Sequence, residues 1–584
     1  MWPFSSLWIT DKAKAQAVTN AKRAERDVQL AAAPELTACH EEFLQAGAHE
    51  IVSRIEKGDW TATEVVEAYI AQAAQAQSAT NCLTEVAFQE ALKRAGELDA
   101  EYAATKVLRG PLHGVPFSAK DQFDIAGLDT SIGFTSWANN KATANAILVD
   151  QLISLGAIPI AKTNVPQTMF SFECNNPLWG RTTNPYNSKY TCGGSSGGEA
   201  ALLAMDGSAL GIGSDVGGSL RIPAAYCGIY GLKPSFGRVS KAGARSSNPG
   251  FEGIKSVTGP MARNVKDLVL FCKAIFGLAD ESHSDYTFVP MPYRQSELPK
   301  QLKIGYYTSD GFAKASPACT RAVMEVVEVL KGQGHECVEI ELPDVTDCLE
   351  IYLALISSDG YKRMTSPLGP DPMEPSLFLP VYGTRVPSFL RKFGAWVSES
   401  MLGDPLFAKF IRASRVKTVY EMNGWAERRN KWNAMFYEKV WNHYGLDAII
   451  CPVQAMPQIP HGGSTTVNSL VISTAVYNLV DAPVGIVPVT HVDGVKDQLT
   501  KEWTAPGTRK RSELMEKRLY TVEQPMYNPV DMEGMPVSVQ IIGKKWEDEK
   551  VLAMMSVVDD ALGSSRGFGP RSCAHRGGKG VADK

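Results

Sequence analysis

The sequence predicts an α/β protein built around one large sheet. Two stretches alternate between helical and strand patterns: a helix at 146–155 before a strand at 157–161, and a strand at 303–307, a helix at 320–331 and a strand at 337–342. Apolar residues make up 44% of the chain, which is ordinary for a folded globular protein. No Pro/Ser-rich linker interrupts residues 35–562, so we expect one large domain there.

Charge and cysteine usage exclude several classes of protein. Lys and Arg number 59 against 63 Asp and Glu, a net charge of −4, which gives no global electrostatic case for nucleic acid. The 11 cysteines are scattered without C-x-x-C pairs, which argues against a zinc ribbon or a disulfide framework and favours reduced thiols. The apolar start, residues 1–9, is too short for a secretory signal, and polar residues and prolines interrupt the apolar stretch 470–492. We therefore expect a cytoplasmic protein.

The two ends of the chain differ in character from its body. Residues 11–33 are alanine-rich and charged and predict a helix without an apolar stripe, so we assign 1–34 to an N-terminal surface arm. Thr61 and Glu64 form a capping box that predicts a helix start in the body. Residues 493–531 are charged and predict a surface excursion, with the basic run 509–511 inside it. The glycine-rich basic tail, 563–584, is predicted to be disordered.

Eleven glycines lie between residues 193 and 231, and serines accompany them. Glycine allows sharp turns and lets backbone N–H groups approach a ligand. A flexible linker is one interpretation, but the apolar runs 200–205 and 222–229 flank these glycines. A phosphate or dinucleotide cradle is another, but the stretch lacks the P-loop ending and the Rossmann glycine spacing. The third interpretation is acyl transfer by a serine.

Two serines are candidates for the attacking group. Gly217 and Gly218 place unhindered N–H groups directly before Ser219, as an oxyanion hole requires. Alternatively, residues 194–198 form a G-x-S-x-G nucleophile elbow with Ser196 attacking, but none of the nine histidines lies in a setting distinctive of its base.

Without histidine, the base is a lysine whose pKa must fall from about 10.4 to about 7–8. Burial can lower it that far. Lys120 lies in a mostly apolar, strand-like segment, 115–121, and is the candidate. The alternative is a solvated lysine at the end of a strand.

These motifs together resemble the amidase signature family. The resemblance rests on Gly193-Gly-Ser-Ser-Gly-Gly-Glu199, Asp215-Val-Gly-Gly-Ser-Leu-Arg-Ile-Pro223 and Gly228-Ile-Tyr-Gly-Leu-Lys-Pro234, and extends over most of 35–562. It implies a catalytic domain over those residues with a large, mixed, twisted sheet flanked by helices on both faces.

The resemblance also implies a Ser–cis-Ser–Lys triad. Ser219 would be the nucleophile that forms the acyl-enzyme, Ser195 the bridging serine after a cis peptide bond that follows Gly194, and Lys120 the base. The family's oxyanion hole is formed by backbone N–H groups, which here belong to Val216, Gly217, Gly218 and Ser219. Neither a metal nor an organic cofactor is expected.

The substrate expectation also comes from the resemblance. Residues 162–180 are similar to the fatty acid amide hydrolase branch, whereas 80–85 and 120–123 are similar to fungal general amidases and acetamidases. The first likeness implies that Met169 lines the substrate site and that Phe170 and Phe172 are candidate walls of the acyl pocket; the alternative is that these side chains are core.

We therefore expect hydrolysis of long-chain fatty acid amides, with short-chain or aryl amides as the alternative. An amidotransferase subunit releasing ammonia for tRNA-bound glutamate fits segment 162–180 less well. A catalytically silent lipid-binding protein is a further alternative, against which the complete triad argues.

A lipid substrate requires an entry route from a membrane. Residues 385–417 contain seven Lys and Arg and two acidic residues, and their aromatic and aliphatic side chains follow helical spacing. A basic amphipathic helix pair of this kind is typical of a membrane surface, although an ordinary packed helix pair has the same periodicity. Beyond a small-molecule amide, the partners we consider are a membrane held peripherally through 385–417 and a second copy in a homodimer.

Overall fold

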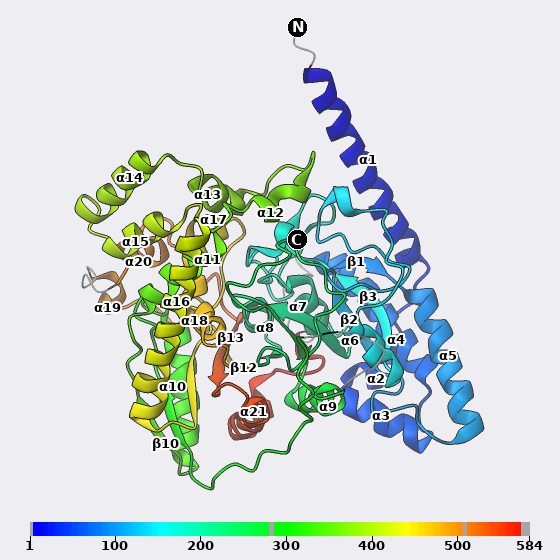
Figure 1. The fold of residues 1–584 in the computed structure, drawn as a ribbon. Helices are drawn as coiled ribbons and strands as arrows, with labels where there is room; N and C mark the ends of the chain where they lie inside the picture. The colour runs from blue at the N-terminus through cyan, green and yellow to red at the C-terminus, as the bar shows by residue number, and fades with distance from the viewer. Residues whose placement is uncertain (1–3, 279–284, 286, 506–510, 574–584) are drawn as a thin grey trace.

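The computed structural model describes residues 4–278, 285, 287–505 and 511–573 (Figure 1). Eleven strands form one continuous sheet and two short strands form a separate ribbon. The strands are β1 Leu83–Val86, β2 Pro116–Lys120, β3 Ile158–Thr163, β4 Asn175–Asn176, β5 Gly180–Arg181, β6 Leu210–Asp215, β7 Tyr230–Lys233, β8 Val257–Ala262, β9 Lys303–Tyr306, β10 Glu336–Glu339, β11 Ala448–Pro452, β12 Val484–His491 and β13 Pro536–Ile542.

The large sheet has the order β1-β3-β2-β6-β8-β7-β12-β13-β11-β9-β10. Strand β2 is parallel to β3 and β6, and β9 is parallel to β10 and β11, whereas the six strand pairs that complete the order are antiparallel. The sheet is therefore mixed, as the resemblance implies. The strand–helix–strand predicted over 303–342 is confirmed as a parallel unit, because β9 and β10 pair directly after one helical crossover.

Helices make up most of the remaining structure. They are α1 Phe4–Ala31, α2 Glu41–Gln45, α3 Ala48–Lys57, α4 Ala62–Thr80, α5 Phe88–Thr105, α6 Ile147–Ser154, α7 Gly197–Ala204, α8 Arg221–Tyr226, α9 Val265–Ile275, α10 Pro317–Gly332, α11 Val345–Ile356, α12 Lys362–Thr365, α13 Pro375–Gly383, α14 Ser388–Ser400, α15 Pro405–Ala413, α16 Val419–Phe436, α17 Ser464–Val467, α18 Ile472–Leu479, α19 Lys501–Thr504, α20 Glu513–Glu516 and α21 Asp548–Leu562.

Helices cover both faces of the sheet, and neighbouring residues of β13 demonstrate it. The side chain of Gln540 accepts a hydrogen bond from Arg221 of α8 at 3.0 Å. The next residue, Ile541, points to the opposite face, because successive side chains of a strand alternate. Its cross-strand partner, Gly485, lies against Met555 of α21 on that face. The sheet is thus buried between two helical layers.

Two helices lie where local sequence signals predicted them. Thr61 accepts a hydrogen bond from the Glu64 N–H, and the Glu64 carboxylate accepts one from the Thr61 N–H, so the predicted capping box begins α4. The predicted helix at 146–155 is α6, and strand β3 follows it.

The N-terminal helix α1 lies on the surface, and its second half is docked on the body. In Figure 1 the first turns of α1 project from the body and its last turns lie against it. On the docked half, the buried Lys22 ammonium contacts Glu85 at 2.7 Å and Asp129 at 3.1 Å, and Arg26 donates to the Leu83 carbonyl at 2.9 Å. Side-chain ions, rather than an apolar stripe, attach this helix, which explains why its sequence has no such stripe.

Two predictions for the second half of the chain need correction. Residues 563–573 are ordered against the body: the Arg571 N–H donates to Asp206 at 3.0 Å and the Phe568 ring stacks on His491 at 4.3 Å. Residues 574–584 lie outside the described residues, so the prediction of a disordered tail stays a prediction for them. The excursion 493–531 contains buried side chains, among them Leu519 and Tyr527, so it is anchored by apolar contacts that its charged composition hides. Of the basic run 509–511, residues 509 and 510 lie outside the described residues.

Among the described residues, no helix is long and apolar enough to cross a membrane.

Candidate active site

Strand β2 ends in Lys120, whose ammonium group lies in the interior. Its side chain is fully buried, and Nζ is 2.6 Å from Ser195 Oγ and 2.9 Å from Ser214 Oγ. Burial lowers the pKa of Lys120 to about 7, although the negative charge of Asp215 opposes the change. Lys120 is therefore largely able to accept a proton near neutral pH, and it is not a solvated lysine at a strand end.

The loop 192–196, before α7, brings Ser195 to Lys120. The peptide bond between Gly194 and Ser195 is cis. The Ser196 N–H donates to the Ser219 carbonyl at 3.1 Å, so this loop lies beside the one that carries Ser219. Ser195 is therefore between the lysine and the second glycine loop. Among the described residues, no hydrogen bond joins the hydroxyls of Ser195 and Ser219.

A buried ion pair shapes the second glycine loop, 215–221. Arg221 donates to both Asp215 carboxylate oxygens at 3.0 Å, and Asn478 of α18 donates to the same carboxylate at 2.8 Å. Burial would raise the pKa of Asp215, but the positive charge and hydrogen bonds of Arg221 outweigh burial and hold that pKa well below its usual range. The loop thus closes around an ionised carboxylate. Gly218 has φ +129°, a conformation that glycine adopts without strain.

Backbone N–H groups of this loop differ in their availability. The Gly218 N–H already donates to Asp215 Oδ1 at 2.8 Å. Among the described residues, the N–H groups of Val216, Gly217 and Ser219 have no acceptor. Of the four N–H groups that the resemblance assigns to an oxyanion hole, three are thus without an acceptor among the described residues, and the fourth is bonded to the Asp215 carboxylate.

Ser196 does not have the surroundings of a nucleophile. It is fully buried at the N-terminus of α7, and its hydroxyl lacks a hydrogen-bond partner among the described residues. No described histidine lines the cavity that Ser219 faces. The nucleophile-elbow alternative therefore lacks both access and a base.

A buried acid lies beneath the lysine. Glu199 on α7 accepts hydrogen bonds from Ser118 Oγ and, at 2.6 Å, from Thr163 Oγ1. Burial raises the pKa of Glu199 to about 8, so the carboxyl is largely protonated at neutral pH. Ser118 and Lys120 share one face of β2, and the uncharged acid leaves the lysine without a strong counter-ion.

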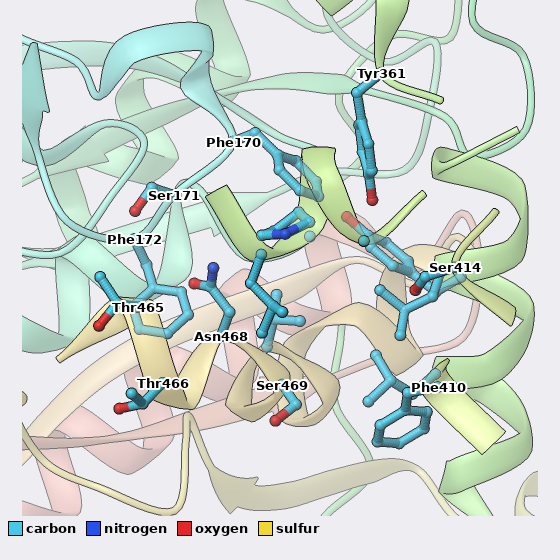
Figure 2. Close-up of a pocket in the computed structure, with 18 of the residues that line it drawn as sticks. Phe170, Ser171, Phe172, Tyr361, Phe410, Ser414, Thr465, Thr466, Asn468 and Ser469 are labelled. Carbon is cyan, nitrogen blue, oxygen red and sulfur yellow. The ribbon is translucent and has the colours of Figure 1, made fainter. Parts of the chain in front are cut away.

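Ser219 opens into a cavity of about 450 Å³, a volume typical of small-molecule sites. Figure 2 shows aromatic rings of Phe170, Phe172, Tyr361 and Phe410 around it. Met169 also lines it, as expected, as do Val216 and Gly217. Phe170 and Phe172 are therefore walls of this cavity rather than only core. The inner end holds Gly194 and Ser219, and the lining continues outward to α13 and α14.

Several lining residues come from segments that carry no motif. They are Leu349, Tyr352 and Leu353 of α11, Tyr361, and Thr465, Thr466, Asn468, Ser469 and Val471 around α17. Tyr352 donates to the Val216 carbonyl at 3.3 Å, which ties α11 to the glycine loop. Sequence reasoning missed these residues because only the fold brings them to the cavity. Ser214, in contrast, belonged to the glycine stretch already singled out, yet its contact with Lys120 was not foreseen.

The two helices within 385–417 differ in exposure. On α14, Phe389, Phe393 and Trp396 are exposed by 68%, 61% and 51%. On α15, Leu406 and Phe410 are buried against the body. Apolar periodicity on α15 is thus explained by packing, whereas on α14 nothing among the described residues covers it.

Comparison with known proteins identifies the family. The family model described as Amidase matches residues 64–552, most of the chain. This chain belongs to the amidase signature family. The amidase is 33% identical over 522 residues to Fatty acid amide hydrolase 1 of Caenorhabditis elegans. The aligned region covers 88% of this chain and 87% of that protein. It is also 33% identical over 540 residues to Acetamidase of Emericella nidulans, covering 89% and 90%.

A solved structure named Fatty acid amide hydrolase superposes on the amidase with a TM-score of 0.79 and 30% sequence identity, covering 90% of this chain and 87% of that one. Family membership and the names of these relatives make the protein a hydrolase of amide bonds. The names divide between fatty acid amide hydrolases and acetamidases, so they leave the size of the substrate open.

Proposed function

We propose that this amidase cleaves amides through an acyl-enzyme on Ser219, with Ser195 and Lys120 moving the proton. The observation that carries the proposal is the buried contact of 2.6 Å between Lys120 Nζ and Ser195 Oγ, beside a serine that faces the cavity. A lysine that is largely neutral can accept a proton from Ser195 while Ser195 takes the proton of Ser219. Neither histidine nor metal is required for these steps.

The remaining steps follow from the loop 215–221. Ser219 Oγ attacks the amide carbon, and the N–H groups of Val216, Gly217 and Ser219 are available to the oxyanion; one such donor contributes about 3–4 kcal/mol. Ser195 returns a proton to the amine as the C–N bond breaks. Water then attacks the ester carbon, the same groups take its proton, and Ser219 is released with the carboxylic acid.

Long-chain fatty acid amides are the substrate class that we propose. The cavity is long enough to reach from Ser219 to the exposed helix α14, and aliphatic and aromatic side chains dominate its lining. Burying an acyl chain there gains about 0.8 kcal/mol per methylene group, a gain that acetamide cannot obtain.

The test is a panel of primary amides from acetamide to oleamide, assayed for kcat/KM with wild type and Ser219→Ala. We expect kcat/KM to rise with acyl length and Ser219→Ala to lose at least about 1000-fold for every substrate. Ser366→Ala, at an exposed serine that is not part of the cavity lining, serves as the matched control and should retain activity. Full activity of Ser219→Ala would refute the acyl-enzyme, and activity confined to acetamide or anilides would favour the short-chain or aryl alternative.

We further propose that α14 contacts a membrane surface peripherally. Its exposed aromatic side chains adjoin the outer end of the cavity, so a lipid amide leaving the bilayer would enter directly. Co-sedimentation with vesicles tests this contact: the double change Phe393→Ser and Trp396→Ser should release the protein. Tyr420→Ser, at an exposed residue outside α14, should not. Equal vesicle binding by both variants would exclude α14 as the contact.

A further inference from the structure

Arg391 brings a charge into an otherwise uncharged cavity. It is on α14 and is the one charged side chain among the described residues that line the cavity. Its neighbour Leu390 and the facing Leu379 of α13 are exposed by 48% and 66%, so this part of the lining is the outer end. Gly194 and Ser219 mark the inner end. The cavity therefore runs from Ser219 to a partly buried guanidinium.

The Arg391 guanidinium has hydrogen-bonding capacity left over. Nη1 donates to the Val386 carbonyl at 3.3 Å, and within the described part of the chain no carboxylate pairs with this arginine. Glu421, an acid that acts on the neighbouring Lys417, pairs with Arg415. Burial and the positive charge of Arg415 lower the pKa of Arg391, which is the sign of a cation without compensation.

Other cations adjoin this position. Burial and the charges of Arg415 and Arg391 lower the pKa of Lys417 to about 7, so the three side chains act on one another electrostatically. Lys417 Nζ donates to the Ala413 carbonyl at 2.6 Å and caps α15, and Arg415 is neutralised by Glu421. Arg391 is thus the member of this group that faces the cavity without an anion.

We propose that Arg391 binds the carboxylate of a fatty acid whose chain lies in the cavity with its tail toward Ser219. A guanidinium presents N–H donors in a planar fork that matches a carboxylate, and a neutral amide offers no such charge. The carboxylate keeps contact with water at the rim while the chain is buried among apolar side chains. A ligand in this orientation occupies the space in front of Ser219.

This assignment deepens the proposed function, because a fatty acid is the product of the proposed hydrolysis. The carboxylate formed at Ser219 begins at the inner end, so a product bound at Arg391 is a molecule that has left and returned in the reverse orientation. Fatty acid should then inhibit amide hydrolysis competitively, giving feedback by product.

Direct binding tests the proposal without any turnover. We would titrate wild type, Arg391→Gln and Arg385→Gln by calorimetry with dodecanoate and dodecyl phosphate below their micellar concentrations and with dodecanol below its solubility limit. Arg391→Gln should weaken dodecanoate binding by about ten-fold, the value of one charge-assisted contact at a half-exposed position, and change dodecanol binding less than about two-fold. Arg385, whose guanidinium lies over the Tyr382 ring outside the cavity lining, is the matched control and should change neither.

If Arg391→Gln binds dodecanol as the wild type does, the cavity is intact in that variant. Equal losses for dodecanoate and dodecanol, or no loss for dodecanoate, would overturn the assignment. A larger loss for dodecyl phosphate than for dodecanoate would assign the position to a phosphate headgroup and overturn it as well. If the protein fails to hydrolyse lipid amides but Arg391→Gln selectively loses dodecanoate, the carboxylate site stands and the proposed substrate falls.

Discussion

At the scale of single residues, burial sets the chemistry available at Lys120. The ammonium form loses its hydration inside the sheet. The Asp215 carboxylate, which favours that form, is already paired with Arg221, and a second nearby acid, Glu199, is largely protonated. The neutral amine is therefore accessible near neutral pH. The same burial that costs stability for a charged lysine supplies a base.

The pH profile should report this lysine. The proposed mechanism requires neutral Lys120, so kcat/KM should increase as pH rises through about 7 and level off above it, falling about ten-fold per pH unit below. Lys120→Arg should lack the rising limb, because a guanidinium stays protonated over this range. A wild-type profile that is flat from pH 5 to 9 would contradict the assignment of Lys120 as the base.

Asp215 should be essential for stability as well as for loop geometry. Asp215→Asn leaves Arg221 buried without its counter-charge, and we expect the free energy of unfolding to fall by about 3–5 kcal/mol, measured by urea denaturation. Asp59→Asn removes an exposed pairing with Arg54 at 3.0 Å and should cost less than about 1 kcal/mol. Equal costs for the two changes would mean that the buried pair does not hold the loop.

At the scale of elements, the glycine loops work because α7 and α8 follow them directly. Loop 192–196 runs into α7 and loop 215–221 runs into α8, and both helices are buried. Loop 192–196 begins beside the isolated bridge between Thr183 and Thr191. Loop 215–221 begins at the end of strand β6 and ends in a buried helix, so it is fixed at both ends and its N–H groups are held in place. Flexibility, the usual consequence of glycine, is thereby removed.

Helix α1 should depend on one buried lysine. Lys22→Met leaves Glu85 and Asp129 buried without their cation, so we expect about 3 kcal/mol of lost stability and faster hydrogen exchange along α1. Lys14→Met, on an exposed position of the same helix, is the control and should change neither quantity. Unchanged exchange in α1 of the Lys22 variant would show that other contacts attach the helix.

At the scale of the whole molecule, the last described residues contact a helix near the start of the body. Arg571 contacts Glu41 at 2.9 Å and its N–H donates to Asp206, a buried carboxylate that also pairs with Arg263 at 2.8 Å. The last described residues thus link helix α2 to the loop after α7, and Asp206 links that loop to Arg263, which directly follows β8. Residues 563–573, which the sequence predicted to be disordered, therefore pack against the body.

A stop codon after Leu562 should therefore destabilise the entire protein. It removes the Phe568 ring from His491 and two hydrogen bonds from the Asp206 carboxylate, and we expect a loss of about 2–4 kcal/mol, seen as a lower urea midpoint. Arg571→Gln, which retains the backbone donor, should lose less than the truncation. An unchanged midpoint for the truncated chain would mean that this segment contributes nothing to folding.

Local signals in the sequence determined much of this protein. The capping box at Thr61, the α/β alternation and the glycine-serine stretch depend on neighbouring residues only, and neighbours are read directly from a sequence. The motifs around Ser195 and Ser219 led to the family, and with it to the mixed sheet and to Lys120.

Only the tertiary structure decided which distant side chains share a space. Tyr352 and Asn468 reach the cavity from segments more than 100 residues away from Ser219, and no local pattern marks them. Arg391 belongs to the segment 385–417 that the sequence pointed to, but only the fold places its side chain in the cavity lining. The same holds for burial: equal apolar periodicity left α14 exposed and α15 covered, because periodicity tells which face is apolar and not what lies opposite it. The Gly218 N–H is occupied for a similar reason, since the Asp215 carboxylate folds back onto it and only coordinates reveal that contact.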